Sequence, residues 1–164
     1  METLVERNAE FAKTRFNPGL TMRPTLATLV ICCADTRVDP TYLFGAEQGE
    51  IMALRNVGGR VTPGTLDELA ALDKVSPAGL DSWELIVMQH TQCGIIRVQS
   101  HPDLLAAYFQ VGEDELPSVF VDDPRAAVTR DVALLRADPR FQGARTSGLV
   151  YDVTTGLTET IVPN

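Results

Sequence analysis

Short apolar runs that alternate with amphipathic stretches constrain the fold of this chain more than any other feature of its sequence. The runs are nearly continuous in apolar residues, which is typical of strands buried in a parallel sheet. We expect strands at residues 26–32, 51–54, 83–88 and 147–153, followed by a return strand that ends at residue 162. A Thr-Thr-Gly turn at residues 154–156 predicts that the last two strands form a hairpin.

Apolar residues recur at helical spacing between these strands. We expect helices at residues 3–13, 65–74, 102–110 and 124–137. Thr65 and Glu68 would form a capping box on the second helix, and Ser100 is a candidate cap for the third. The alternation predicts an α/β fold with a mainly parallel central sheet flanked by helices and a C-terminal hairpin strand. We expect residues 1–164 to form a single domain, in which residues 1–24 are an N-terminal helix and a connector.

The charge of the chain limits its partners. The formal net charge is -8, and such an acidic surface disfavours nucleic acid and anionic membranes. No window approaches the ~20 apolar residues of a membrane span. The first residues also lack the apolar stretch that a signal peptide needs. We therefore expect a cytoplasmic protein that binds neither nucleic acid nor membrane.

The chain has three cysteines, Cys32, Cys33 and Cys93. An odd count with two adjacent residues is a poor disulfide framework, and a bridge between adjacent cysteines would be strained, which disfavours a thiol redox function. Three inert, buried thiols are the simplest interpretation. Successive side chains of a strand point to opposite faces, so we assign Cys32 to the core and leave Cys33 available for chemistry.

Polar and ligand-type side chains follow three of the predicted strands. They form the segments 33–37 (Cys-Ala-Asp-Thr-Arg), 55–59 (Arg-Asn-Val-Gly-Gly) and 90–94 (His-Thr-Gln-Cys-Gly). Sites in open α/β sheets lie outside the carboxyl ends of the strands. The sequence therefore predicts that these segments converge at one edge of the sheet.

The residue types in these segments suit a zinc ion. His90 and Cys93 are close enough in sequence to face one ion, and Cys33 arrives from the end of another strand. Two thiolates and an imidazole are good zinc ligands, and three protein ligands leave the fourth tetrahedral position open, as in catalytic sites.

Asp35 and Arg37 are the candidate catalytic pair beside such an ion. Residues two apart in extended chain share a side, so Cys33, Asp35 and Arg37 can line one face. The planar fork of Arg37 would keep Asp35 ionised and turn it away from the metal. Asp35 could then accept a hydrogen bond from a metal-bound water, which is a potent nucleophile when ionised.

Each segment also has a purely structural interpretation. A lone His-x-x-Cys is a weak metal signal, and Cys-x-Asp-x-Arg could be a turn with a surface ion pair. Arg55 and Asn56 could anchor a turn, while Gly58 and Gly59 could simply reverse the chain. We interpret His101, beside a proline, as a surface loop residue. The joint occurrence of the three segments at strand ends is what favours a site.

Together the segments resemble the motifs of β-class carbonic anhydrases, which carry Cys-x-Asp-Ser-Arg, Arg-Asn-x-Gly and His-x-x-Cys-Gly in this order. The motifs stand here as Cys33-Ala34-Asp35-Thr36-Arg37, Arg55-Asn56-Val57-Gly58 and His90-Thr91-Gln92-Cys93-Gly94. The resemblance extends from about residue 26 to residue 94, and the later helix and terminal hairpin fit it as well.

The resemblance implies a zinc enzyme in which a zinc-bound hydroxide attacks carbon dioxide to give bicarbonate. It implies Zn²⁺ ligation by Cys33, His90 and Cys93, and an Asp35–Arg37 catalytic dyad. The implied substrate pocket comprises Thr36, Asn56, Val57, Gly58, Gly59 and Gly94. It also implies a homodimer or a dimer of dimers (a homotetramer), with the N-terminal helix against the partner subunit.

Two departures from the family pattern leave the substrate open. Thr36 replaces the usual Ser, and residues 17–31 lack the Gln that many members carry before the first cysteine ligand. The short chain resembles a compact subgroup that includes carbonyl sulfide and carbon disulfide hydrolases. Carbonyl sulfide hydrolysis to hydrogen sulfide and carbon dioxide is therefore the alternative reaction. A non-catalytic zinc-binding regulatory protein is a further alternative, which an intact dyad disfavours.

Overall fold

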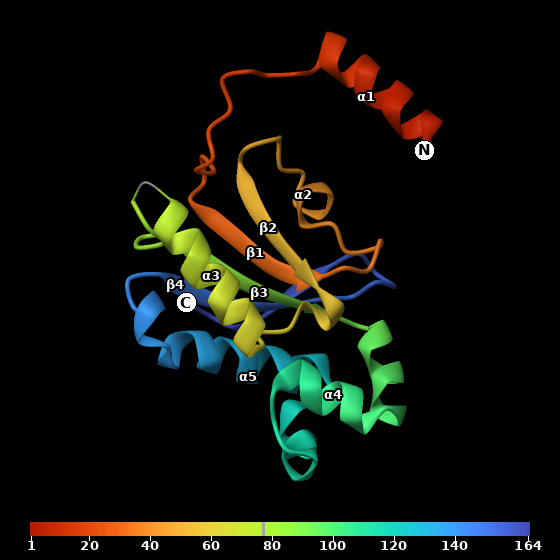
Figure 1. Ribbon diagram of the computed structural model, residues 1–164, viewed down its shortest axis with the longest axis vertical. Helices are drawn as coiled ribbons and strands as arrows, with labels where there is room; N and C mark the ends of the chain where they lie inside the picture. The colour runs from red at the N-terminus through yellow and green to blue at the C-terminus, as the bar shows by residue number, and fades with distance from the viewer. Residues whose placement is uncertain (77) are drawn as a thin grey trace.

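The computed structural model describes residues 1–76 and 78–164 as a five-stranded sheet with helices packed on it (Figure 1). The strands are β1 (Thr28–Cys33), β2 (Ile51–Asn56), β3 (Glu84–His90), β4 (Arg145–Tyr151) and β5 (Thr158–Val162). Their order is β2-β1-β3-β4-β5, with β5 antiparallel to β4 and the other neighbours parallel. The predicted α/β fold with its C-terminal hairpin is confirmed.

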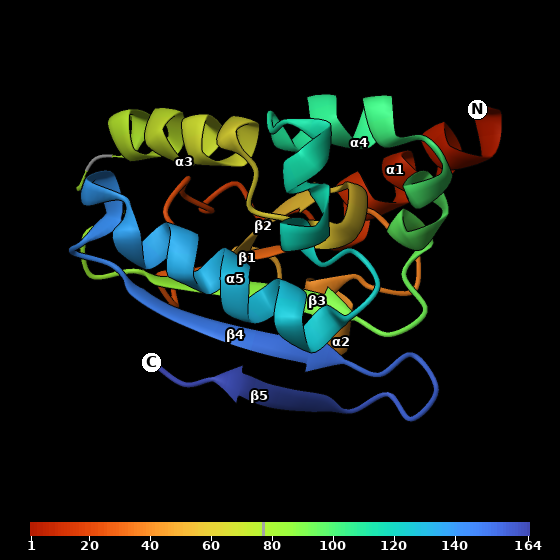
Figure 2. The same ribbon diagram turned by 90° about the horizontal axis from the view of Figure 1, so that it is seen from below.

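The helices connect the strands and cover one face of the sheet most fully. The α-helices are α1 (Glu2–Thr14), α2 (Pro40–Leu43), α3 (Pro63–Val75), α4 (Pro102–Phe109) and α5 (Pro124–Ala137). Short 3-10 helices are η1 (Val57–Gly59), η2 (Gly94–Ser100), η3 (Glu113–Val119) and η4 (Pro139–Phe141). Figure 2 shows α3 and α5 on the same face of the sheet.

Alternation along β1 divides the interior into separate apolar clusters. Leu29 and Ile31 pack with Leu69 of α3 and Leu135 of α5 in the main core. The next-door residues Val30 and Cys32 face the other side, where Met88 and Tyr151 complete a smaller cluster. The sequence assignment of Cys32 to the core is confirmed, since it is fully buried.

A third cluster lies at the carboxyl edge of the sheet. It joins Cys33 and Cys93 to apolar side chains of η2, α4, η3 and the segment after η3, namely Ile95, Leu105, Phe109, Val119 and Val121. The strand ends that carry the predicted site are therefore packed against a small apolar cap, which excludes water from one side of the two sulfurs.

Two helix starts differ from the sequence prediction. The capping box at Thr65 is wrong: α3 begins at Pro63, and the side chain of Thr62 accepts a hydrogen bond from Thr65 N at 3.2 Å. The cap at Ser100 is also wrong, because its hydroxyl donates to Arg97 O at 3.0 Å and His101 precedes α4. In both cases a proline occupies the first turn and fixes where the helix begins.

The N-terminal helix α1 lies apart from the sheet, joined to it by an extended connector (Figure 1). It contains no buried residue, and Leu4 and Val5 are 68% and 62% exposed. Within the described residues, no helix combines the length and the apolar character that crossing a membrane requires.

Candidate metal centre

The carboxyl ends of β1 and β3 bring three ligand-type side chains together. Cys33 ends β1 and His90 ends β3, and these two strands are adjacent and parallel in the sheet. Cys93 follows His90 after a tight turn. The ligand atoms of the three buried residues all lie within 4.8 Å of one another, and the two sulfurs are 3.8 Å apart.

This arrangement fits a zinc ion. Two sulfurs at ~2.3 Å from a tetrahedral zinc are about 3.8 Å apart, which matches the observed separation. His90 Nδ1 lies 2.9 Å from the Thr91 carbonyl, so it carries the proton and leaves the lone pair on Nε2. Nε2 is buried and has no hydrogen-bond partner among the described residues, which a bound metal would supply.

The turn between His90 and Cys93 is held by the β4–β5 hairpin. Gln92 adopts a left-handed backbone conformation with φ of 55°, which is strained for a residue other than glycine. Thr91 N donates to Tyr151 O at 3.0 Å, and Val153 N donates to Thr91 Oγ1 at 3.1 Å. Gln92 Nε2 donates to Thr154 Oγ1 at 3.2 Å. These bonds keep the strained turn in the conformation that directs Cys93 toward Cys33.

The pKa values of the Cys33 and Cys93 thiols are shifted in opposite directions. The pKa of Cys33 is lowered, chiefly because Cys93 hydrogen-bonds to its sulfur, with help from backbone N–H groups such as that of Asp35, which donates to the sulfur at 3.4 Å. The same contact with Cys33, together with burial, raises the pKa of Cys93. The negative charge of the pair therefore resides on Cys33, the form in which a cysteine binds metal.

Asp35 and Arg37 form a two-pronged ion pair beside the three ligands. Arg37 Nε and Nη2 donate to the two carboxylate oxygens of Asp35 at 3.0 and 2.7 Å. The Arg37 backbone N–H adds a third bond at 2.9 Å, and Nη2 also reaches Gln92 O at 3.2 Å. These bonds from Arg37 hold the pKa of Asp35 well below its usual range. Asp35 is absent from the cluster of ligand atoms among the described residues, which leaves three ligands.

Side chains of the second predicted segment, residues 55–59, hold the backbone at the end of β1 and in the loop beside it. Arg55 donates to Cys33 O at 3.1 Å and to Asp35 O at 2.7 Å. The Asn56 side chain accepts from Arg60 N and donates to Arg60 O, both at 2.8 Å, so it is engaged in its own loop. Both side chains therefore act on the backbone around the site.

The glycines of this segment permit a close approach to Cys33. Gly58 and Gly59 have φ of 79° and 63°, and a Cβ on Gly59 would lie 2.7 Å from Cys33 N. The remaining residues of the predicted pocket, Thr36, Val57 and Gly94, are exposed around the centre. The structure thus gathers the predicted residues at one edge of the sheet, with the three ligand-type side chains, Gly58 and Gly59 buried and with Thr36, Val57 and Gly94 at the rim.

Comparison with known proteins decides the family. A family model described as carbonic anhydrase matches residues 28–114, which is more than half of the chain. The chain belongs to the carbonic anhydrase family. It is 28% identical over 164 residues to β-carbonic anhydrase 1 of Mycobacterium bovis, covering 95% of this chain and 94% of the relative.

Solved structures agree with the family assignment. A carbonic anhydrase from Streptococcus mutans superposes with a TM-score of 0.77 at 25% identity, covering 98% of this chain and 96% of that one. The apo form of a carbon disulfide hydrolase superposes with a TM-score of 0.65 at 22% identity, covering 96% and 88%. The second likeness is one of fold. Solved structures with this fold thus include both a carbonic anhydrase and a carbon disulfide hydrolase.

Three polar residues beside the centre were missed by sequence reasoning: Gln89, Arg60 and Asp131. Gln89 is 3% exposed, Arg60 1% and Asp131 0%. A signal for Asp131 was present, because it occupies the same face of α5 as the buried residues Ala127, Val128, Val132 and Leu135. A charged residue on an apolar helix face indicates a buried partner.

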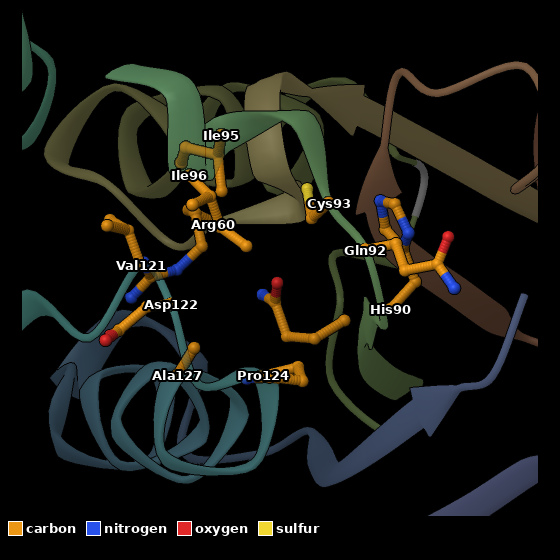
Figure 3. Close-up of a pocket in the computed structure, with 11 residues that line it drawn as sticks. Arg60, His90, Gln92, Cys93, Ile95, Ile96, Val121, Asp122, Pro124 and Ala127 are labelled. Carbon is orange, nitrogen blue, oxygen red and sulfur yellow. The ribbon is translucent and has the colours of Figure 1, made fainter. Parts of the chain in front are cut away.

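A small cavity lies between these polar residues and the ligands. Arg60, Gln89, His90 and Cys93 are among the residues that line it, and Figure 3 shows the side chains of Arg60, His90 and Cys93 among its lining residues. Its volume of about 20 Å³ suits one water molecule. Arg60 Nη1 is buried without a hydrogen-bond partner among the described residues, so it is a ready donor to such a water.

Proposed function

We propose that this chain is a zinc enzyme that hydrates carbon dioxide to bicarbonate and a proton. The observation that supports this proposal most strongly is that the ligand atoms of Cys33, His90 and Cys93 lie within 4.8 Å of one another. The ion pair of Asp35 and Arg37 lies beside them. Cys33 and Cys93 as thiolates and His90 through Nε2 would hold the ion, and a fourth position would stay open. When bound, zinc lowers the pKa of a coordinated water and so supplies a nucleophile near neutral pH.

The dyad orients this chemistry. Arg37 keeps Asp35 ionised, so Asp35 acts as a hydrogen-bond acceptor at neutral pH and not as a proton donor. Because Arg37 occupies both carboxylate oxygens, Asp35 is restrained from becoming a fourth ligand. The Asp35 side chain is 20% exposed, so it would be accessible to accept a hydrogen bond from a water molecule at the metal centre and to fix the orientation of that water.

The surroundings of the sulfurs favour an apolar substrate. Ile95, Val119 and Val121 pack with Cys33 and Cys93, and carbon dioxide is a small apolar molecule. The same apolar surroundings suit carbonyl sulfide, so its hydrolysis to hydrogen sulfide and carbon dioxide is the second candidate. The fold likeness to a carbon disulfide hydrolase supports keeping it.

One experiment separates the two reactions. We would load the purified protein with zinc and measure carbon dioxide hydration by stopped flow alongside sulfide release from carbonyl sulfide. Fast hydration with negligible sulfide release supports the first proposal, and efficient sulfide release with feeble hydration supports the second. Zinc-loaded protein that turns over neither substrate would refute both and leave a zinc-binding protein without this catalysis.

We further propose that a second copy of the chain covers α1. An isolated helix of 13 residues is only marginally stable in water, and α1 has no buried residue. An open hollow of about 240 Å³ on the sheet face away from α3 and α5 is lined by apolar side chains, including Leu26, Val30 and Ile86. A partner copy would bury both surfaces and give a dimer or a dimer of dimers.

Light scattering tests this assembly. The chain has a mass of 17.9 kDa, so a dimer or tetramer is readily resolved from a monomer. Leu4→Glu with Val5→Glu should lower the mass toward that of one chain, whereas Glu6→Gln on the same helix should leave it unchanged. A wild-type protein that is monomeric at micromolar concentration would overturn the proposal.

A further inference from the structure

A buried ion pair connects the loop beneath the metal centre to α5. Arg60 Nε lies 2.7 Å and Nη2 3.0 Å from the two oxygens of Asp131, and both side chains are almost completely buried. Burying two charges is unfavourable, and a well-packed apolar pair of similar volume often stabilises a fold as well or better. Stability alone therefore does not explain this ion pair, and its contacts with the rest of the site indicate its role.

Those contacts fix the loop at residues 57–61 from two sides. Asp131 accepts from Val61 N at 3.0 Å as well as from Arg60. Arg60 Nη2 donates to Val119 O at 2.7 Å, and its guanidinium lies 4.8 Å from the centre of the Phe109 ring. The loop is thus tied to α5 through Asp131 and to η3 and α4 through Arg60.

The same loop packs against Cys33 and against the segment that follows Cys93. Gly59 lies so close to Cys33 that an added Cβ would be 2.7 Å from its backbone nitrogen. An added Cβ on Gly58 would lie 2.5 Å from Ile95 Cδ1, two residues after Cys93. A movement of this loop is therefore transmitted directly to the ligands.

Gln89 connects the loop to the third ligand. Its side-chain Nε2 donates to Gly59 O at 2.7 Å and lies 3.4 Å from Asp131 Oδ2, and Gln89 immediately precedes His90 in β3. The Asp131 carboxylate, 71 residues from Arg60 in sequence, thus holds the loop through Arg60 and Val61 N and also lies beside the side chain of Gln89.

We propose that Asp131 is a positioning residue for the metal centre, which holds the 57–61 loop against the backbone of Cys33 and so fixes where the Cys33 sulfur lies. This inference rests on the proposed function in that the cluster binds a metal ion. The position of a thiolate ligand decides how strongly the sulfur bonds to the ion, so a shift of the loop would change both the metal affinity and the strength of the ion as a Lewis acid. Partners outside the ligand set have effects of about 10–100-fold on metal affinity or activity.

The test uses cobalt(II) in place of zinc, because the thiolate-to-cobalt charge-transfer absorption reports how the sulfurs bond to the ion without any substrate. Asp131→Asn should shift this absorption, change metal affinity in a chelator competition by about 10-fold or more, and lower kcat with little change in KM. Leu135→Ala is the matched control, because Leu135 is equally buried on α5 but packs in the main core. It should lower stability and leave the absorption and affinity unchanged.

A double variant separates positioning from stability. Arg60→Met with Asp131→Leu replaces the pair by apolar side chains and should restore thermal stability relative to Asp131→Asn. We expect it to keep the shifted absorption and the altered affinity, because Val61 N and Gly59 lose their ties. A double variant with wild-type absorption and affinity would overturn the inference, as would an equal shift in Leu135→Ala.

These measurements test the positioning role of Asp131 separately from the proposed reaction. Neither the absorption nor the affinity depends on substrate, so both remain decisive if the protein binds cobalt yet hydrates no carbon dioxide. Wild-type protein that binds no cobalt at Cys33 and Cys93 would overturn the positioning role together with the metal centre.

Discussion

Cys32 and Cys33 are adjacent in β1, yet their side chains lie in two regions with opposite chemistry. Cys32 faces the apolar cluster of Val30, Met88 and Tyr151, where burial raises the pKa of its thiol to about 12. Cys33 faces the carboxyl edge of the sheet, where the Cys93 thiol and backbone N–H groups lower its pKa. Both side chains are nearly inaccessible to solvent, so burial alone does not separate them.

The difference indicates that the supply of hydrogen-bond donors distinguishes Cys33, the thiol that we propose as a ligand, from Cys32. A thiolate needs donors to replace the water it loses, and only the side of β1 that meets the 57–61 loop and the turn after His90 provides them. Strand alternation then assigns one cysteine to each environment. Four predictions test how far this contrast extends.

The largest effect should come from removing the ligand thiol. Cys33→Ser should lose zinc on dialysis and more than about 1000-fold of turnover, beyond the 10–100-fold typical of residues outside the ligand set. His90→Ala and Cys93→Ser should behave alike. Cys32→Ala, the matched control one residue away, should keep zinc and turnover and lose about 1–2 kcal/mol of stability. Metal analysis and stopped-flow hydration check both, and zinc loss in Cys32→Ala would erase the contrast.

Asp35→Asn should have the next largest effect. The substitution removes the charge that Arg37 holds and should reduce turnover about 10²–10³-fold, the range typical of losing one preorganised hydrogen-bonding group of an active site. Zinc content should stay at the wild-type value, because Asp35 is outside the ligand cluster. Full activity in this variant would mean that Asp35 has no part in catalysis and that the segment at the end of β1 contributes only the Cys33 ligand.

Gly59→Ala should show how closely the loop presses on Cys33. Its Cβ would lie 2.7 Å from Cys33 N, so the strand end or the loop must move, and zinc affinity should fall about 10–100-fold. Gly45→Ala provides the control, because Gly45 has a similar φ of 59° with nothing within 4 Å. It should lose about 1–2 kcal/mol from backbone strain and keep its zinc affinity. Equal zinc affinities would contradict the close approach.

The smallest effect should be a loss of stability at alkaline pH that is caused by ionisation of the buried Cys32 thiol. Because the folded-state pKa of Cys32 is raised, its contribution to stability is complete below pH 9.0 and is lost as the pH rises toward about 12. Between pH 8 and 10 the metal-free wild-type protein should lose about 1 kcal/mol more unfolding free energy than Cys32→Ala. Denaturant titrations of both proteins measure this difference, and parallel curves would show that Cys32 does not resist ionisation.

The sheet and the strand-end residues could be predicted from sequence because both depend on local patterns. Apolar runs gave the five strands, and the rule that sites lie at carboxyl ends placed Cys33, Asp35 and His90 at one edge. The helix starts were less accurate, since a threonine on either side of Pro63 is a plausible cap and only the tertiary fold selects Thr62.

The buried network could not be derived in the same way. Arg60 and Asp131 are 71 residues apart, and nothing local to either names the other. Gln89 looks like an ordinary strand residue until its contact with Gly59 O is known. Such pairings depend on how α5 packs across β3, which a periodicity argument does not specify.

The distance in sequence between the two sulfur ligands has a consequence for folding. Cys33 and Cys93 are 60 residues apart, so an ion held by both closes a large loop of chain. A permanent cross-link of that span would restrict the unfolded chain by about 4 kcal/mol in the chain-entropy model. A metal ion applies the same restriction reversibly, and free zinc concentration then sets how much of it the protein retains. The resistance of this enzyme to unfolding should therefore follow the zinc supply of its surroundings.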